Sequence, residues 1–191
     1  MSISKHSIVR AYLQDLGKKN NIPSQDVEHL IDQYFEELKV YHRGESKQLA
    51  TITRGENNEI IIARSRKPAN VRFHLGKLLY FIVKTGAAVV AFHVHPLTIL
   101  FFIFDLLKDA LEVTTIELKE EEGQLLLAIY ELQLRRPNRV ITTDFLEAQL
   151  QDSHLKARLA KRLSKLHDYG CITLNMDSIT VTETIVIRNE D

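Results

Sequence analysis

The sequence is poor in cysteine, glycine and proline. Among 191 residues it has one cysteine, Cys171, with seven glycines, four prolines and no tryptophan. A single cysteine cannot form an internal disulfide or supply the paired thiolates of common zinc sites, so we expect an intracellular, cytoplasmic protein with no bound metal. Cys171 itself is expected to be a small buried side chain.

The sequence also lacks the motifs of common catalytic and nucleotide-binding sites. Its glycines form no GxGxxG or GxxxxGK loop, and there is neither a Gly-x-Ser-x-Gly elbow nor an HExxH helix. Glu120, Glu121 and Glu122 are adjacent, but the helix dipole explains acidic residues in the first turn of a helix. We therefore predict a protein that is not an enzyme, with no catalytic residues, no cofactor and no small-molecule substrate.

The chain has no net charge, because 25 acidic residues balance 25 basic ones. Its overall charge therefore gives no attraction toward nucleic acids or anionic membranes. The composition, 45% hydrophobic and 26% charged, is that of a folded globular protein. The patterns along the chain predict an N-terminal helical region, residues 1–112, and a C-terminal domain, residues 113–191.

The N-terminal region is predicted to begin with two amphipathic helices and a β-hairpin. Apolar residues at helical spacing predict one helix over residues 4–17, with Gly17 as C-cap, and a second over 24–38, with Ser24 as N-cap. Two β-prone segments then flank a turn rich in Gly and Asn, which predicts a hairpin over residues 48–63. The basic stretch from 64 to 72 is expected to be a solvated loop.

The longest uncharged stretch runs from Thr85 to Phe104, where 20 residues include no Asp, Glu, Lys or Arg. A run of roughly 18 apolar residues can cross a membrane, so membrane association through residues 85–104 is one hypothesis. Polar histidine rings near the centre argue against it, because lipid supplies no hydrogen-bond partners. Pro96 also divides the run, leaving halves that are too short to span a bilayer.

We therefore predict two apolar helices, residues 76–94 and 97–112, joined at His95-Pro96 and covered by other helices or by a partner. His93 and His95 are expected to bond the backbone at helix ends rather than a metal. So much apolar surface in a short chain also favours an interface with a partner protein or a second copy. The apolar stripe expected at that interface consists of Leu100, Phe101, Phe104, Leu107 and Leu111.

Three helices are predicted in the C-terminal domain, after a short strand at 114–118. The first spans residues 119–134, and either Thr142 or Thr143 caps a short second helix. Asp152-Ser153 opens the third helix, residues 154–169, and Gly170 suits its C-terminal end. Two helices joined by a short turn have the spacing of a helix-turn-helix.

Beyond Gly170 the sequence alternates as strands do, over residues 171–174 and 179–187, around a turn at 175–178. Three helices followed by a hairpin, with the segment Leu163 to Ile172 as the junction, resemble the winged helix-turn-helix superfamily over about residues 117–187. The resemblance implies an α+β, mainly helical protein with a C-terminal winged helix.

The third helix of such a domain contacts DNA or a partner. Its leucines are expected to pack inward, with Arg158, Lys161 and Lys165 on the opposite side and two further cations flanking the apolar stripe. The residues expected to contact DNA or a partner are Lys156, Arg158, Lys161, Arg162 and Lys165.

The charge of this domain argues against DNA as the ligand. From Glu117 to Asp191 there are 10 Lys and Arg against 13 Asp and Glu, and the expected wing tip carries Asp177 and no cation. We therefore predict an adaptor or accessory subunit that binds a partner protein. Its layout resembles small subunits of bacterial multi-protein systems, including antiviral defence assemblies. A DNA-binding regulator is the alternative, and a membrane-associated protein is a second one.

Overall fold

The computed structural model describes residues 5–38, 51–63, 71–85, 92–112, 117–176 and 178–188. Two antiparallel helices come first. They are α1 (Lys5–Lys19) and α2 (Ser24–Tyr34). Gly17 does not cap α1 as predicted: it lies within the helix, where a Cβ atom would come 2.3 Å from Val27 Cγ2 of α2. Its missing side chain therefore lets the two helices approach closely. Ser24 is the first residue of α2 and does not cap it, since the N-cap is Pro23.

A five-stranded mixed sheet follows, in the order β1-β4-β7-β3-β2. The predicted hairpin is confirmed within the described residues: its strands pair antiparallel, and Asn57 and Asn58 in the turn have φ of 55° and 59°. The loop predicted at 64–72 is wrong at its end, because Val71 and Arg72 belong to a strand; residues 64–70 and 48–50 lie outside the described residues. The strands are β1 (Phe35–Glu37), β2 (Thr51–Arg54), β3 (Glu59–Ala63), β4 (Val71–Phe73) and β7 (Thr184–Arg188).

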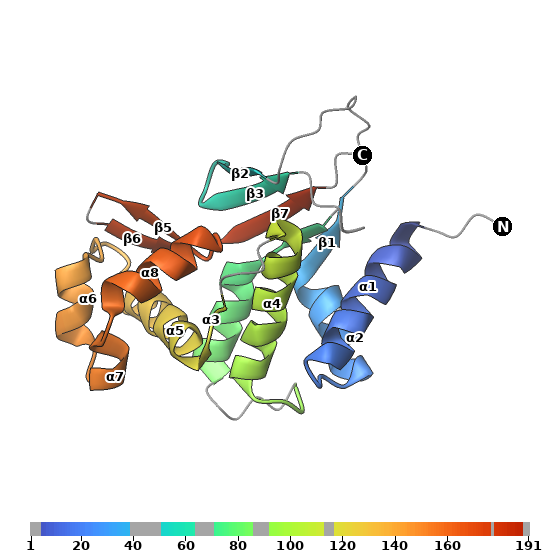
Figure 1. Ribbon diagram of the computed structural model, residues 1–191, viewed down its shortest axis with the longest axis horizontal. Coiled ribbons are helices and arrows are strands. Elements are labelled where there is room, and N and C mark those ends of the chain that lie inside the picture. The colour runs from blue at the N-terminus through green and yellow to red at the C-terminus, as the bar shows by residue number, and fades with distance from the viewer. Residues whose placement is uncertain are drawn as a thin grey trace.

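The last strand of the chain forms the middle of this sheet. β7 runs parallel to β3 and antiparallel to β4 (Figure 1). The predicted strand 179–187 is thus two strands, because the chain leaves β6 (Ser178–Val181) at Thr182 and Glu183 and enters the other sheet. The predicted boundary between residues 112 and 113 does not hold for β7, which completes the sheet of the N-terminal region.

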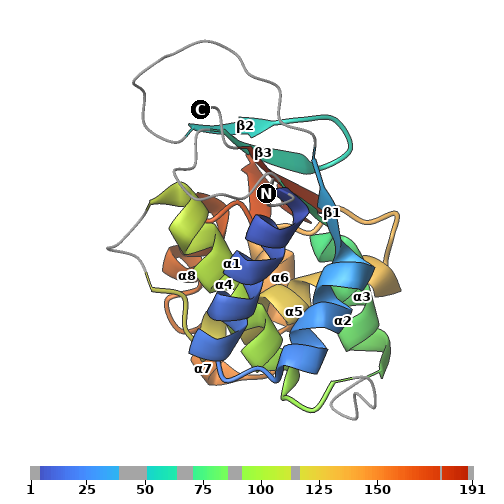
Figure 2. The ribbon, with the colours of Figure 1, turned by 90° about the vertical axis from the view of Figure 1, so that its right-hand side faces the viewer.

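The apolar helices α3 (Leu75–Thr85) and α4 (Pro96–Leu111) lie against the same side of the sheet, with α1 and α2 beside them (Figures 1 and 2). The first is shorter than predicted: it ends at Thr85, residues 86–91 lie outside the described residues, and 92–95 are not helical. Pro96 is the first residue of α4, as its fixed φ and missing N–H favour. Within the described ranges, no helix is both long and apolar enough to cross a membrane.

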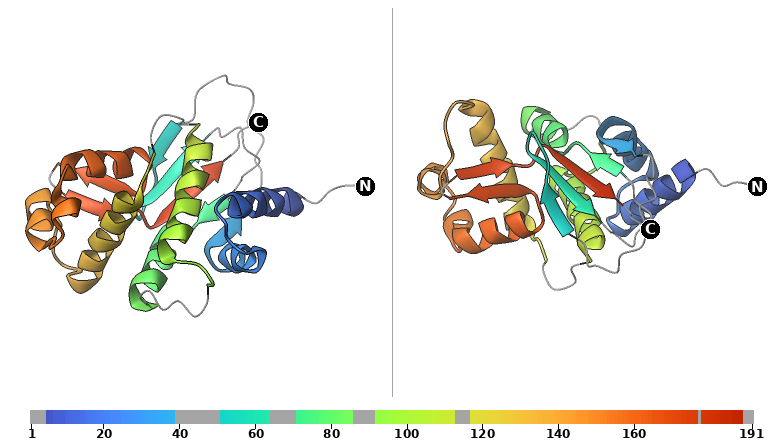
Figure 3. Two further views of the ribbon diagram at one scale, coloured as in Figure 1. Left: turned by 60° about the horizontal axis from the view of Figure 1, so that its bottom comes forward. Right: turned by 90° about the horizontal axis from the view of Figure 1, so that it is seen from above.

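The rest of the chain, as far as the structure describes it, contains four helices and a second, two-stranded sheet. They are α5 (Glu120–Arg135), α6 (Thr143–Gln149), α7 (Ser153–Lys156), α8 (Leu159–Asp168), β5 (Ile172–Asn175) and β6. Figure 3 shows the β5–β6 hairpin beside the five-stranded sheet. The predicted strand at 114–118 falls mostly outside the described residues, and residues 117 and 118 are not in a strand.

Local capping follows the prediction at two positions in this part of the chain. Thr142 Oγ1 accepts a hydrogen bond from the Phe145 N–H at 3.1 Å, which caps α6. Gly170, after the end of α8, has φ of 72°, a conformation that glycine adopts without strain. The predicted third helix, 154–169, is wrong in one respect: it is broken into α7 and α8 at Arg158, whose φ is 59°.

Candidate functional site

Arg162, one of the cations expected to contact a ligand, is turned into the protein. Its Nη1 donates hydrogen bonds to the carbonyl oxygens of His154, Leu155 and Ala157, at 3.2 Å for Leu155. Its Nη2 lies 3.9 Å from Glu121 Oε1, and only 13% of the side chain is exposed. Arg162 therefore binds the C-terminal end of α7 rather than the surrounding solvent.

Lys165 is also held inside the chain, contrary to the outward position expected from helical spacing. Its Nζ donates to the Glu117 carbonyl at 2.9 Å and to Glu122 Oε1 at 3.3 Å. Glu122 is buried, and its second oxygen accepts the Lys119 N–H at 2.8 Å. The carboxylate thus caps α5 and pairs with α8, so Lys165 stabilises the packing of these two helices.

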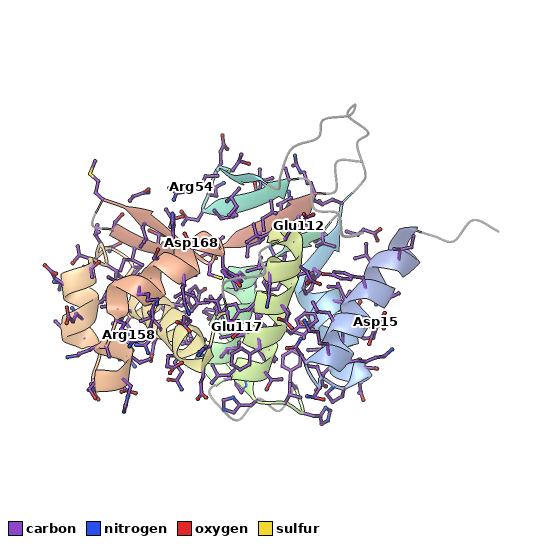
Figure 4. All side chains as sticks on the ribbon, in the orientation of Figure 1. Asp15, Arg54, Glu112, Glu117, Arg158 and Asp168 are labelled. Carbon is purple, nitrogen blue, oxygen red and sulfur yellow. The ribbon has the colours of Figure 1, made fainter. Side chains whose placement is uncertain are left out.

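The remaining cations of this surface are open. Arg158 and Lys161 are exposed and Lys156 is half-buried, and none of the three forms an ion pair with another described residue. Figure 4 shows Arg158 at the junction of α7 and α8. The outward surface of the broken helix therefore presents two exposed cations instead of the three expected.

An arginine side chain from another strand lies against the β5–β6 hairpin, and reasoning from the sequence missed it. Arg54, labelled in Figure 4, lies at the end of β2 and donates from Nη1 to Asn175 Oδ1 at 2.8 Å. Beside it, Met176 is fully exposed with φ of 49°. No local pattern joins Arg54 to Asn175, because the contact depends on how β2 lies relative to the hairpin.

The apolar stripe predicted to face a partner lies largely in the core of this chain. Leu100, Phe104 and Leu107 are buried, while Phe101 and Leu111 are partly exposed and pack against the core. Helical spacing alone cannot distinguish an apolar stripe that packs in the core from one that faces a partner. Here most of the stripe packs in the core. Phe101 and Phe104 border a pocket of about 230 Å³, which is lined by Phe101, Phe104, Asp105, Lys108, Glu117, Leu118 and Tyr169.

A larger apolar groove opens elsewhere, where α3 and the start of α4 meet α5. Its volume is about 400 Å³. Its walls are mainly aliphatic, partly from buried and partly from half-buried side chains, and the polar lining residues are His95, Gln124 and Glu131. Tyr80, which lies on α3 about one turn before Val83, is half exposed. We call this the α3–α5 groove; its lining residues are Ile82, Val83, His95, Pro96, Leu97, Gln124, Leu127, Ala128 and Glu131.

The two central histidines have structural partners. His95 Nδ1 accepts the Leu97 N–H at 3.2 Å and caps α4, as expected of a helix-end histidine. His93 differs from the expectation, because its Nδ1 and its backbone N–H both contact the buried Asp26 carboxylate, each at 2.8 Å. No cluster of three metal-binding side chains occurs among the residues the structure describes.

Cys171 is completely buried, and burial raises the pKa of its thiol. A thiol held protonated in an apolar site is a poor nucleophile, which fits the expected role as a packing residue. Burial likewise raises the pKa of the Tyr169 and Tyr130 hydroxyls, each to about 12. These raised pKa values result from burial in the core and do not indicate a catalytic site.

Comparisons of the chain with protein-family models, curated proteins and solved structures gave no match.

Proposed function

We propose that this protein is a non-catalytic adaptor, an accessory subunit that binds a partner protein in the α3–α5 groove. The partner is a second protein or a second copy of this chain. The observation that carries the proposal is the groove itself, where half-buried aliphatic side chains of α3 and α5 border an opening of about 400 Å³. An open apolar surface with few polar groups is typical of a protein interface.

The position of the groove supports this proposal further. It joins one of the two apolar helices, α3, to α5, the first helix of the C-terminal part. Both regions were expected from the sequence to contact a partner, although through other residues. A partner in the groove would therefore contact both parts of the chain at once.

We further propose that residues 117–181 form a winged-helix module that acts as a scaffold. Its support is the order of helices and strands, the Gly170 junction and the β5–β6 hairpin. The segment before α6 also joins the hairpin, since the Ile179 N–H donates to the Ile141 carbonyl at 2.8 Å. With Arg162 and Lys165 engaged internally, the third helix of this module is poorly equipped to neutralise phosphates.

The way the winged-helix module is attached to the rest of the chain favours an adaptor over a DNA-binding domain on a loose tether. At the crossover into β7, the Thr182 N–H donates to the Cys171 carbonyl and the Glu183 N–H to the Asn58 carbonyl, at 2.9 and 3.0 Å. The Gly76 N–H of α3 donates in turn to the Glu183 carbonyl at 3.0 Å. These bonds link the hairpin to the five-stranded sheet and to α3, which forms one wall of the groove.

The proposal is tested by co-purification of tagged protein from its native host. Leu127→Glu places a charge in the half-buried groove wall and should abolish recovery of the partner. Val140→Glu is the matched control, because Val140 is an exposed apolar residue outside the groove lining, and it should leave recovery unchanged. Thermal melting of both variants establishes that they are folded. Full recovery with a folded Leu127→Glu variant would contradict the proposal.

A DNA-binding regulator is the second candidate, and one observation favours it. Arg54 supplies a cation at the hairpin, and Arg158 and Lys161 leave two more on the exposed surface. Three phosphate contacts would give a slope of about −2.7 for log K against log salt concentration on duplex DNA. Replacing all three with Ala should abolish such binding, whereas Arg188→Ala, at an exposed site on β7, should not. Weak binding that is equal in all variants would remove this candidate.

A further inference from the structure

The break between α7 and α8 occurs where the local sequence favours a continuous helix. Lys156, Ala157 and Arg158 are good helix formers, and neither Gly nor Pro is present to end α7. Arg158 nevertheless has φ of 59° and ψ of 30°, a left-handed conformation that is uncommon for arginine. Local preference and the observed fold therefore conflict at this position.

The side chain of Arg162 resolves this conflict. A continuous helix would use the carbonyls of residues 154 to 157 to accept the N–H groups of residues 158 to 161. Three of these four carbonyls, those of His154, Leu155 and Ala157, instead accept from Arg162 Nη1. In a continuous helix Arg162 would lie about 12 Å along the axis from His154, which puts the carbonyls of His154 and Leu155 out of reach of its guanidinium, so the two arrangements exclude each other.

The apolar spacing is compatible with either arrangement. Leu155 is buried with Leu159 and Leu163 in the broken form, and the three leucines are four residues apart, so they would also share one side of a straight helix. The straight form loses the packing of α7 against α5. It gains backbone hydrogen bonds from the N–H groups of residues 158–161, and it releases Arg158 from its left-handed backbone conformation.

We propose that residues 153–168 are a switch helix: Arg162 holds it broken, and withdrawal of the Arg162 guanidinium converts it into one continuous helix. Straightening exposes the Arg162 side chain beside Arg158 and Lys161 and moves α7 away from α5. An anionic group on a partner that binds the freed guanidinium therefore shifts the chain toward the straight form. The inference does not depend on the α3–α5 groove.

Amide hydrogen exchange of the purified full chain, followed by NMR, tests the switch without any partner. In the broken form the N–H groups of Leu159 and Ala160 are in the first turn of α8 and lack helical acceptors, so they exchange fast. In Arg162→Ala they gain acceptors in the straight helix, and their exchange should slow by about tenfold or more. Lys161→Ala, which removes an exposed cation from the same helix, should leave both rates unchanged.

Two further variants complete the test. Arg158→Gly combined with Arg162→Ala should restore fast exchange, because glycine accepts the left-handed conformation and weakens a continuous helix. If Arg162→Ala does not fold, Arg162→Lys replaces it: lysine lacks the planar fork whose second nitrogen, Nη2, faces Glu121 while Nη1 contacts the carbonyls, so it should hold the break less firmly and also slow exchange. A folded Arg162 variant in which Leu159 and Ala160 exchange as fast as in the natural chain would overturn the proposal.

Discussion

Substitution of Glu122 tests whether Lys165 belongs to the internal structure of the chain. Glu122→Gln keeps an oxygen that can accept the Lys119 N–H but removes the charge that pairs with Lys165. A hydrogen bond between charged groups contributes about 1.5–3 kcal/mol, and the 23% exposure of the Lys165 side chain weakens this one. We expect a loss of about 1–2 kcal/mol in the free energy of unfolding. Glu122→Ala also removes the helix cap, for a total loss of about 2–3 kcal/mol.

Urea unfolding followed by circular dichroism measures these losses at neutral pH. Glu120→Gln is the control, because Glu120 is an exposed carboxylate in the same helical turn, and its change should cost only a few tenths of a kcal/mol. A cycle with Lys165→Met should give a coupling of about 1 kcal/mol between Glu122 and Lys165. The reasoning would be refuted if Glu122→Gln cost no more than Glu120→Gln, or if the two effects simply added.

Three further substitutions or measurements test other parts of the structure. Gly17→Ala should lower the free energy of unfolding by about 1–3 kcal/mol in urea titrations, since the new Cβ meets the buried Val27, and Val27→Ala should restore most of the loss. Alkylation of Cys171 should be undetectable in native protein at pH 8 and should rise in urea along with global unfolding; fast native labelling would contradict its burial. The hydrogen bond from His74 lowers the pKa of Glu36 below its ordinary value of 4.5, so this contact stabilises the fold above pH 4.5 and is lost as pH falls through the lowered pKa. Acid titration of stability should therefore show a difference between natural chain and Glu36→Gln that closes at low pH, and a constant difference would count against the contact.

Structures determined by neighbouring residues could be predicted from the sequence. The β2–β3 hairpin follows from turn residues that accept positive φ, and the α6 cap is Thr142, one of the two adjacent threonines expected there. Gly170 ends the third helical segment, as its freedom of φ suggests. In each case the signal lies within a few residues of the structure it produces.

Structures determined by distant partners could not be predicted in this way. The alternation in residues 179–187 indicates a strand but not the sheet to which it belongs, and Val186 pairs with Ile61 on one side and Arg72 on the other. The break at Arg158 has no local signal either, because it depends on the Arg162 side chain folding back onto α7. Both errors arose because short-range patterns carry no information about these contacts.

The candidate site shows the same limit. Val83, Leu97 and Leu127 border one groove although they come from three separate helices, and no periodicity joins them. The stripe that periodicity selected on α4 serves the core instead. Likewise, the sequence shows the positive charges of α8, but it does not show that Glu121 and Glu122 of α5 contact Arg162 and Lys165 and so keep them from binding a ligand.

Site-specific photo-crosslinking in the native host tests the central claim most directly. A photoreactive amino acid at position 83, in the α3–α5 groove, is compared with the same group at position 161, on the exposed surface of α8. A groove that binds a partner predicts a discrete cross-linked polypeptide from position 83, with little product from position 161. Cross-links to nucleic acid from position 161, with none to protein from position 83, would contradict it.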